Sequence, residues 1–459
     1  MKRKPKRLLV ASLRVITWAL CAACFFLLFA LDNPYLLILN RTSVIVALSF
    51  TLVYVLMATV YGGFDIGVRK SRSIIFSMTM VAFFADIVAH FFMCIMDYTV
   101  IHGGRFVYER PHILLTVFVL QICMITVMAY FGNWVFFCFK KPQRCLMIVR
   151  KGEVFDDWVA KIARFKKQFS IEHIACTSDR DIFEQIEQAD AIFIYNLAET
   201  ERAAFMEYAY QKQKDIFYSV ELVDVIMLGG KQTYFDDVAM VYAAAEKMSV
   251  EEELFKRIID LIFSILALII TSPVLLITAL AIKLEDGGEV FYRQNRATKD
   301  GKIFRIVKFR SMRQEVGDIH RSVTSEDDRI TKVGRVIRKY RIDELPQIFN
   351  VIKGDMSLVG PRPEMVENVE KYTESLPQFS YRLRVKAGIT GLAQVYGRYN
   401  TAPRDKLILD MIYIENYSIW MDIKIFLRTV LVLFTPDRST AAFRNEDKDG
   451  PSPAPEEEA

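Results

Sequence analysis

The sequence predicts a membrane α-helical bundle, a Rossmann-like α/β domain, and a mainly α-helical third domain that contains a re-entrant membrane helix. Three observations favour this fold class. Hydrophobic residues make up 53% of the 459 residues although 25% are charged, and the mean hydropathy is +0.21. Such values indicate long apolar segments beside ordinary globular sequence. Four long apolar runs come first, and behind them short apolar stretches alternate with helix-like segments.

Residues 1–140 are predicted to form four transmembrane helices, at about 8–31, 43–61, 74–96 and 112–139. Each run is long enough, at 1.5 Å per residue, to cross a hydrocarbon core of about 30 Å. The first run follows five Lys/Arg residues and lacks a small-residue cleavage site, so we expect a retained helix and no signal peptide. Basic residues also gather in the second loop and after the fourth run. The positive-inside rule therefore predicts that both ends of the bundle lie in the cytoplasm.

Residues 141–250 are predicted to form the α/β domain. Short strands that alternate with helices are typical of a parallel sheet. The first strand is followed by Arg150-Lys151-Gly152-Glu153, which lacks the G-x-G-x-x-G turn of a dinucleotide site. We therefore expect a spacer or regulatory domain without a nucleotide fingerprint. The predicted strands are 145–149, 171–176, 191–195 and 215–220.

The third domain, residues 251–440, opens with an apolar segment at about 255–283 that is long enough to span a membrane. Ser272 and Pro273 interrupt its middle, where a proline breaks a helix. Both flanks are basic, so neither end is expected outside the cytoplasm. A re-entrant helix explains the proline and both flanks, and a proline-kinked fifth span is the alternative. Residues 441–459, rich in Pro and Glu, predict a disordered tail.

The composition also excludes several classes of site. A net charge of +5 gives no support for a nucleic-acid partner. All seven cysteines precede residue 177 and five of them lie in apolar runs, so no disulfide framework is expected. The five histidines form no metal-binding pair. Any metal should be a hard cation held by carboxylates.

Residues 291–341 form a strongly basic stretch, with 15 Lys/Arg against 6 Asp/Glu. Such a charge beside a membrane segment suits phosphorylated substrates or anionic lipid head groups. A basic surface that only touches lipid is the alternative. Arg362 follows between two prolines, which suits a pre-organised anion contact. The candidate phosphate ligands are Lys308, Arg310, Arg338 and Arg362.

Two adjacent carboxylates, Asp343 and Glu344, lie in this basic setting. The surrounding cations should keep at least one of them ionised, and a carboxylate can act as a nucleophile towards phosphorus. Its neighbour could hold a hard cation that bridges phosphate oxygens. The alternative is that both residues only cap a helix at its N-terminus.

The order of these motifs resembles the bacterial sugar transferase family, the monotopic polyprenyl-phosphate phosphoglycosyl transferases. The first 250 residues look like the long members, which add four transmembrane helices and a Rossmann-like domain. The resemblance covers about residues 254–434. It rests on Phe255-Lys-Arg-Ile-Ile-Asp260, Ser272-Pro273, Phe291-Tyr-Arg-Gln294, Lys308-Phe-Arg-Ser-Met312, Asp343-Glu-Leu-Pro-Gln347, Gly354-Asp-Met-Ser-Leu-Val-Gly-Pro-Arg-Pro363 and Gly388-Ile-Thr-Gly-Leu-Ala-Gln394.

The resemblance implies a catalytic role for the third domain. Asp343 would attack the phosphorus next to the sugar of a nucleotide-diphosphate sugar, such as a UDP-hexose. A polyprenyl phosphate would then take the sugar phosphate from the aspartyl intermediate. Glu344, with Asp343, would bind Mg2+, and Arg338 and Arg362 would stabilise phosphate charge. Ser272-Pro273 would form the break of the re-entrant helix.

The resemblance further implies a bacterial cytoplasmic membrane protein whose active site faces the cytoplasm and starts polysaccharide or glycoconjugate synthesis. We expect residues 1–250 to position a homodimer or to hold pathway partners. Two departures, Ala297-Thr298 for the usual Val-Gly and Ala387 for the usual Pro, bear on local loop geometry or substrate preference. The rival hypothesis is a non-catalytic membrane scaffold or sensor that binds anionic lipid head groups.

Overall fold

The structure is a computed structural model in which two compact units, residues 1–219 and 220–459, are described separately. The tail predicted at 441–459 lies outside the described residues. The structure describes residues 4–67, 69–101, 110–139, 141–150, 152, 155–244, 248–313, 329–397 and 401–433.

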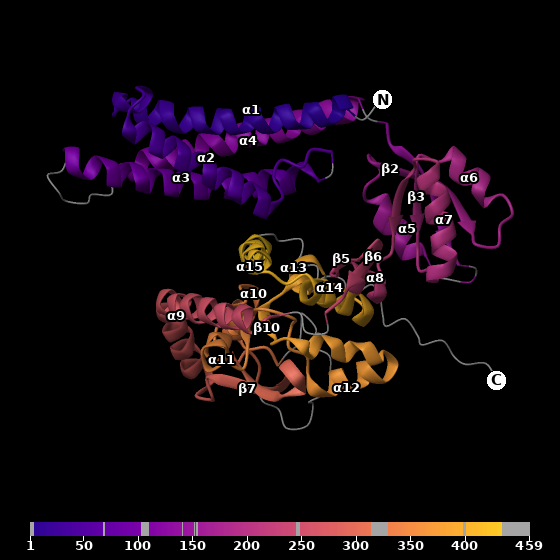
Figure 1. The fold of residues 1–459 in the computed structure, drawn as a ribbon. Helices are drawn as coiled ribbons and strands as arrows, with labels where there is room; N and C mark the ends of the chain where they lie inside the picture. Colours follow the sequence, from indigo (N-terminus) through magenta and orange to yellow (C-terminus); the bar gives the residue numbers. More distant parts are fainter. Residues whose placement is uncertain are drawn as a thin grey trace. The chain divides into compact units, whose positions relative to one another are not determined.

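The first unit begins with four long helices, as the hydropathy pattern predicts (Figure 1). Each is long and apolar enough to cross a membrane. A buried polar contact joins three of them, because Gln121 donates to the Asp86 carboxylate at 3.0 Å and to the Cys21 carbonyl at 3.1 Å. Such hydrogen bonds hold helices together in an apolar environment. The helices are α1 (Lys4–Ala30), α2 (Arg41–Tyr61), α3 (Ser71–Ile101) and α4 (Pro111–Phe139), with a short η1 (Pro34–Leu37) after α1.

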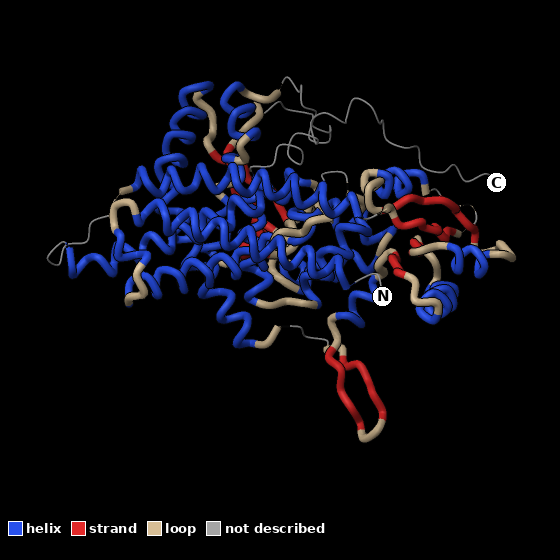
Figure 2. The backbone as a smooth tube through the Cα atoms, turned by 90° about the horizontal axis from the view of Figure 1, so that it is seen from above, coloured by secondary structure: helices blue, strands red, loops and turns tan. Residues whose placement is uncertain are grey.

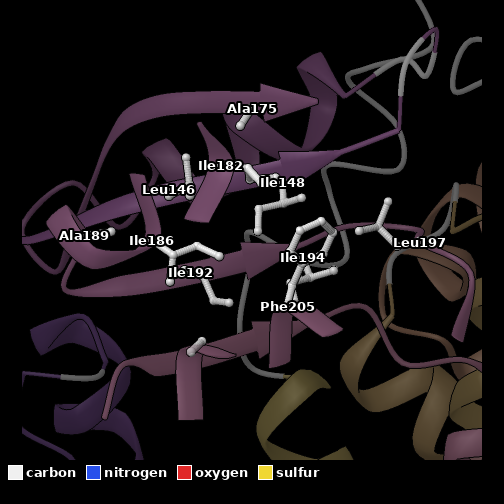
Figure 3. Packing of buried hydrophobic residues seen from close by; sticks show 11 residues of the cluster. Leu146, Ile148, Ala175, Ile182, Ile186, Ala189, Ile192, Ile194, Leu197 and Phe205 are labelled. Atoms are coloured by element: carbon white, nitrogen blue, oxygen red, sulfur yellow. The ribbon is translucent and has the colours of Figure 1, made fainter. Parts of the chain in front are cut away.

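The same unit contains a four-stranded sheet whose neighbouring strands are all parallel, in the order β2-β1-β3-β4. This confirms the predicted α/β pattern. Alternate residues of the strands form a buried core with α6 and α7 (Figure 3). The elements are β1 (Gln143–Val149), α5 (Asp156–Ala163), β2 (Phe169–Cys176), α6 (Ile182–Gln188), β3 (Ala191–Ile194), α7 (Glu199–Gln211) and β4 (Asp215–Tyr218).

The last part of the predicted α/β segment belongs to the second unit. Helix α8 (Leu222–Leu228) places Val225 in the same core as Leu407 and Met411 of α14 (Pro403–Glu415). The antiparallel hairpin of β5 (Lys231–Phe235) and β6 (Val238–Tyr242) extends away from the helices of its unit (Figure 2). Its large side chains are exposed.

Helix α9 (Val250–Asp286) spans 37 residues and is bent along its length (Figure 1). Pro273 has no N–H to donate to the carbonyl of Ile269, four residues earlier. The Ser272 hydroxyl donates to this carbonyl instead, at 2.8 Å. A helix in a membrane tolerates a proline when such a side chain satisfies the freed backbone group.

Both halves of α9 pack against the globular part of the second unit. In the first half, Lys256 pairs with Asp422 at 2.5 Å, and Arg257 donates to the carbonyls of Val351 and Ile352. In the second half, Ile282 packs against Phe309 and other apolar residues. Lys256 and Arg257 are therefore engaged with protein groups, although their charge alone predicts a membrane-surface flank.

Two small sheets and short helices complete the second unit. Strands β7 (Phe291–Ala297) and β8 (Ile303–Phe309) form an antiparallel pair, and β9 (Ser357–Val359) and β10 (Gly388–Thr390) form a parallel pair. Gly388 permits close approach of the latter two, because a Cβ there would lie 2.1 Å from the Gly360 nitrogen. The helices are η2 (Lys299–Gly301), α10 (Lys332–Lys339), η3 (Ile342–Glu344), α11 (Gln347–Lys353), α12 (Val366–Ser375), η4 (Pro377–Arg384), α13 (Leu392–Tyr396) and α15 (Ile419–Leu433).

Candidate active site

Asp343 and Glu344 lie in the short helix η3, between α10 and α11. The chain turns into η3 at Arg341, whose φ of 55° lies in the left-handed region that non-glycine residues rarely adopt. Local strain of this kind often occurs at functional sites. No side-chain cap is made at the start of η3 or of α11. A hydrogen-bonded side-chain cap is therefore absent at these two helix starts, although both carboxylates lie in the first turn of η3, where the helix dipole favours them.

Glu344 is the centre of an ion-pair cluster. Its Oε1 atom accepts from Lys308 Nζ at 2.9 Å and from Arg362 Nη2 at 3.0 Å, and its side chain is 19% exposed. Burial opposes ionisation, but the charges of Arg362, Lys308 and Arg341 outweigh it and hold the pKa of Glu344 far below its usual range. Glu344 is therefore ionised at neutral pH and holds two cations beside Asp343.

Asp343 has a different electrostatic environment from its neighbour. Burial and the negative charge of Glu344 raise the pKa of Asp343 to about 6, although Lys308 and Arg338 act in the opposite direction. Two adjacent carboxylates therefore differ strongly in proton affinity. The higher pKa makes Asp343 the more basic and more nucleophilic of the two when it is ionised.

Arg338 and Arg310, both predicted to bind phosphate, have different surroundings. Arg338 Nη1 is buried and has no hydrogen-bond partner among the described residues, so a donor near Asp343 is available for a ligand. Arg310 instead pairs through Nη2 with Asp286 at the end of α9. Of the four predicted phosphate ligands, Lys308, Arg338 and Arg362 surround the two carboxylates, and the contacts of Arg310 lie elsewhere.

A small cleft adjoins this cluster. Its walls carry two predicted ligands, Lys308 and Arg362, together with groups that the sequence did not single out. Among the latter is Arg296, whose pKa is lowered by burial and by the charge of Arg362. Arg296 lies within the basic stretch, so composition gave a weak signal for it. The polar lining residues are Arg296, Lys308, Gln347, Arg362 and Gln394.

The carboxylates fit a hard cation only in part. Glu344 uses Oε1 for both ion pairs, which leaves Oε2 without a partner among the described residues. Together with the Asp343 carboxylate, this gives oxygen donors from two adjacent residues. No cluster of three or more His, Cys, Asp or Glu suited to a metal occurs in the described parts of the chain. Such a donor set suits Mg2+ that is bound mainly through water and substrate phosphates.

The part of this chain that matches a known protein family lies in the second unit. A family model described as bacterial sugar transferase matches residues 251–436. Over 194 residues the chain is 42% identical to the UDP-glucose:undecaprenyl-phosphate glucose-1-phosphate transferase of Caulobacter vibrioides. That alignment covers 41% of this chain and 72% of the relative.

Alignments with two longer relatives also cover only part of each chain. The chain is 45% identical over 185 residues to the UDP-N-acetylgalactosamine-undecaprenyl-phosphate N-acetylgalactosaminephosphotransferase of Aeromonas hydrophila, which covers 39% of this chain and 44% of that protein. It is 46% identical over 182 residues to the UDP-glucose:undecaprenyl-phosphate glucose-1-phosphate transferase of Klebsiella pneumoniae, covering 38% and 39%. The chain thus aligns with less than half of these two relatives. Because their names specify different sugars, similarity at this level does not identify the sugar.

Proposed function

This chain belongs to the bacterial sugar transferase family, and we propose that it transfers a sugar 1-phosphate from a UDP-sugar to polyprenyl phosphate. The convergence of Lys308, Arg338 and Arg362 on Asp343 and Glu344 carries this proposal. A diphosphate needs several cations close to the reacting phosphorus, and a covalent mechanism needs a carboxylate there as well. One cluster provides both.

In the first step, an oxygen of the Asp343 carboxylate attacks the phosphorus that carries the sugar. A bond forms between this oxygen and phosphorus, the bond from phosphorus to the bridging oxygen breaks, and UMP leaves with the electron pair. In the second step, a phosphate oxygen of polyprenyl phosphate attacks the same phosphorus and releases the Asp343 carboxylate. The products are a polyprenyl-diphosphate sugar and UMP, so each bond that is broken is replaced by one of the same kind.

The side chains around Asp343 have separate tasks in this scheme. Arg362 and Lys308, held by Glu344, stabilise the charge on the phosphate oxygens, and the free Nη1 of Arg338 adds a further donor. Glu344 and Asp343 would hold Mg2+, which when bound neutralises diphosphate charge. Glu344 itself is a poor nucleophile, because its low pKa and two ion pairs reduce its basicity.

The test is release of UMP by the purified full-length protein, with polyprenyl phosphate, Mg2+ and a panel of UDP-sugars. Release with one sugar, together with formation of the lipid product, is the expected result and identifies the donor. No release with any UDP-sugar, in protein whose fold is verified by circular dichroism, would overturn the proposal.

The pH dependence of the first step follows from the pKa of Asp343. The ionised carboxylate is the reactive form, so activity should be nearly full at pH 7 and above, fall to half at a pH of about 6, and decrease further below it. Between pH 7 and pH 5 we expect a loss of about tenfold, with a single ionisation. Single-turnover release of UMP without polyprenyl phosphate is the proper measurement, because the acceptor phosphate itself titrates near neutral pH. A flat profile over this range would contradict the assignment of Asp343.

We further propose that α9 enters and leaves the membrane on the cytoplasmic side, as both of its halves pack on one globular unit. Cysteines placed at Val250 and at Glu289, in a chain whose natural cysteines are replaced by serine, should both react with an impermeant maleimide in inside-out vesicles. Neither should react in right-side-out vesicles. Leu39, in the loop after α1, is the matched control with the opposite pattern expected. Opposite labelling of Val250 and Glu289 would indicate a fifth span instead.

The environment and assembly of the protein are part of the same proposal. We propose that the enzyme acts in the bacterial cytoplasmic membrane, with its active site on the cytoplasmic face, at the start of polysaccharide or glycoconjugate synthesis. The proposed acceptor lipid and the predicted orientation support this. The homodimer expected from residues 1–250 stays a prediction, and native mass spectrometry of the full chain tests it.

A further inference from the structure

The turn that carries Arg362 is held by hydrogen bonds to the carbonyl oxygens of three successive residues, 361–363. The Gly388 N–H donates to the Pro361 carbonyl at 2.9 Å, Arg382 Nη2 donates to the Arg362 carbonyl at 2.9 Å, and Arg296 Nη1 donates to the Pro363 carbonyl at 3.2 Å. The three donors come from β10, η4 and β7. Because both prolines also have a fixed φ, the backbone at Arg362 has little freedom left.

Arg382 is the most deeply buried of these donors. Its side chain is 2% exposed, its Nε donates to Oδ2 of Asp410 at 3.0 Å, and its Nη2 forms an ion pair with the same oxygen at 2.8 Å. Asp410, on α14, is 1% exposed, and the Arg382 guanidinium also lies over the ring of Phe379. A buried ion pair is weak evidence for stability, because loss of hydration offsets much of its attraction. The orientation of the Arg382 guanidinium is more informative than the stability of the pair. Asp410 and Phe379 hold this guanidinium so that Nη2 points to the Arg362 carbonyl.

Arg296 plays the equivalent part on the other side of the turn. Its Nη2 donates to the Gln294 side-chain oxygen at 2.7 Å, which leaves Nη1 for the Pro363 carbonyl. Gln294 and Arg296 lie on the same face of β7, two residues apart. The Arg296 guanidinium also lies close to that of Arg362, whose charge contributes to the lowered pKa of Arg296.

We propose that Arg382, oriented by Asp410, and Arg296 are positioning residues that hold the Pro361-Arg362-Pro363 turn, so that the Arg362 guanidinium stays beside Glu344 and the transferred phosphate. This inference rests on the function proposed above. In the described structure neither Arg382 nor Arg296 hydrogen bonds to Asp343 or Glu344, so their effect passes through the backbone of the turn. Displacement of a phosphate-binding group by about 1 Å can reduce a rate roughly 100-fold.

The test uses the full-length variant Arg382→Leu/Asp410→Leu, in which both charges of the buried pair are removed together. Glu364, which also pairs with Arg382 at 3.6 Å, keeps its pair with Lys406 at 3.8 Å. We expect kcat for UMP release to fall roughly 10- to 100-fold, with a much smaller change in KM for the UDP-sugar. The matched control is Arg305→Leu, an exposed arginine on β8, for which near wild-type activity is expected. Wild-type kcat in the folded Arg382→Leu/Asp410→Leu variant would overturn the proposal.

A mutant cycle separates positioning from general damage to the fold. If Arg382 acts through Arg362, its loss should matter little once Arg362 is gone. Adding Arg382→Leu/Asp410→Leu to the Arg362→Ala variant should therefore lower the activity further by less than about twofold. Losses that multiply would show a purely structural role and overturn the proposal.

Amide exchange gives a readout that does not depend on activity. Exchange should become faster in the Arg382→Leu/Asp410→Leu variant at the Gly388 N–H, which donates to the Pro361 carbonyl, and at the Ala297 N–H, which donates to the Glu364 carbonyl. Exchange in the β1–β4 sheet should stay unchanged. Unchanged exchange at the turn would count against the inference even if the wild-type protein released no UMP. The absence of UMP release from wild type would instead contradict the proposed function.

Discussion

Substitution of Asp343 by asparagine should abolish UMP release, with a loss of at least about 10³-fold relative to wild type. Asparagine has nearly the same shape but no anionic oxygen, so it cannot form the bond to phosphorus. The variant also removes the group whose pKa is raised to about 6 by burial and by Glu344. The measurement is UMP release by the full chain with the preferred UDP-sugar.

Asp300→Asn is the matched control. Asp300 is exposed in η2 with a φ of 59°, a left-handed conformation that asparagine also tolerates, so activity should be unchanged. A second measurement looks for the intermediate itself. Incubation of wild type with the UDP-sugar alone should add the mass of one sugar phosphate to the intact protein, and the Asp343→Asn variant should show no addition.

Other outcomes would point elsewhere. UMP release that persists in the Asp343→Asn variant would exclude Asp343 as the nucleophile and favour direct transfer between the two substrates. A folded wild-type protein without any release, whose membrane association depends on the basic residues, would favour the scaffold hypothesis.

The second large effect is expected for Arg362→Ala, with a loss of roughly 10²- to 10³-fold in kcat. This change removes a donor for the phosphate oxygens and one of the two ion pairs of Glu344. With Arg362 absent, the pKa of Glu344 should rise, although Lys308 still keeps the carboxylate ionised at neutral pH. Arg362→Lys should recover only part of the rate, because lysine keeps the charge but not the planar pair of donors.

The control for Arg362 is Arg305→Ala. Arg305 is an exposed residue on β8, and its removal changes the net charge by the same amount. Near wild-type kcat is expected for this variant. Equal losses in the two variants would indicate that overall positive charge matters and that the placement of Arg362 does not.

The sequence carried enough information for features that depend on local composition. The four long apolar helices follow from runs of apolar residues, which reach the length of about 20 residues that a hydrocarbon core requires. The parallel sheet follows from the alternation of short strands and helices. Asp343, Glu344 and the proline-flanked Arg362 were visible as short motifs, because their chemistry lies in neighbouring residues.

The end of the α/β domain was harder to predict from the sequence. Residues 222–242 continue the alternating pattern, yet α8 packs with α14 in the second unit. An amphipathic helix and a hairpin do not reveal in their own sequence which core they join. The same holds for Lys256, whose charge suggests a membrane flank but whose partner, Asp422, lies 166 residues away.

The site itself shows what the sequence determined and what only the tertiary structure decided. The sequence determined which residues can do the chemistry: two carboxylates, several cations and a rigid turn. Tertiary structure decided which cations meet the carboxylates, since Glu344 pairs with Lys308 and Arg362, 36 and 18 residues away, whereas Arg310 pairs with Asp286. It also brought Arg382 and Asp410 behind the Arg362 turn. Ion pairs of this kind depend on distances of a few ångströms between remote segments, and those distances exist only after the segments have packed together.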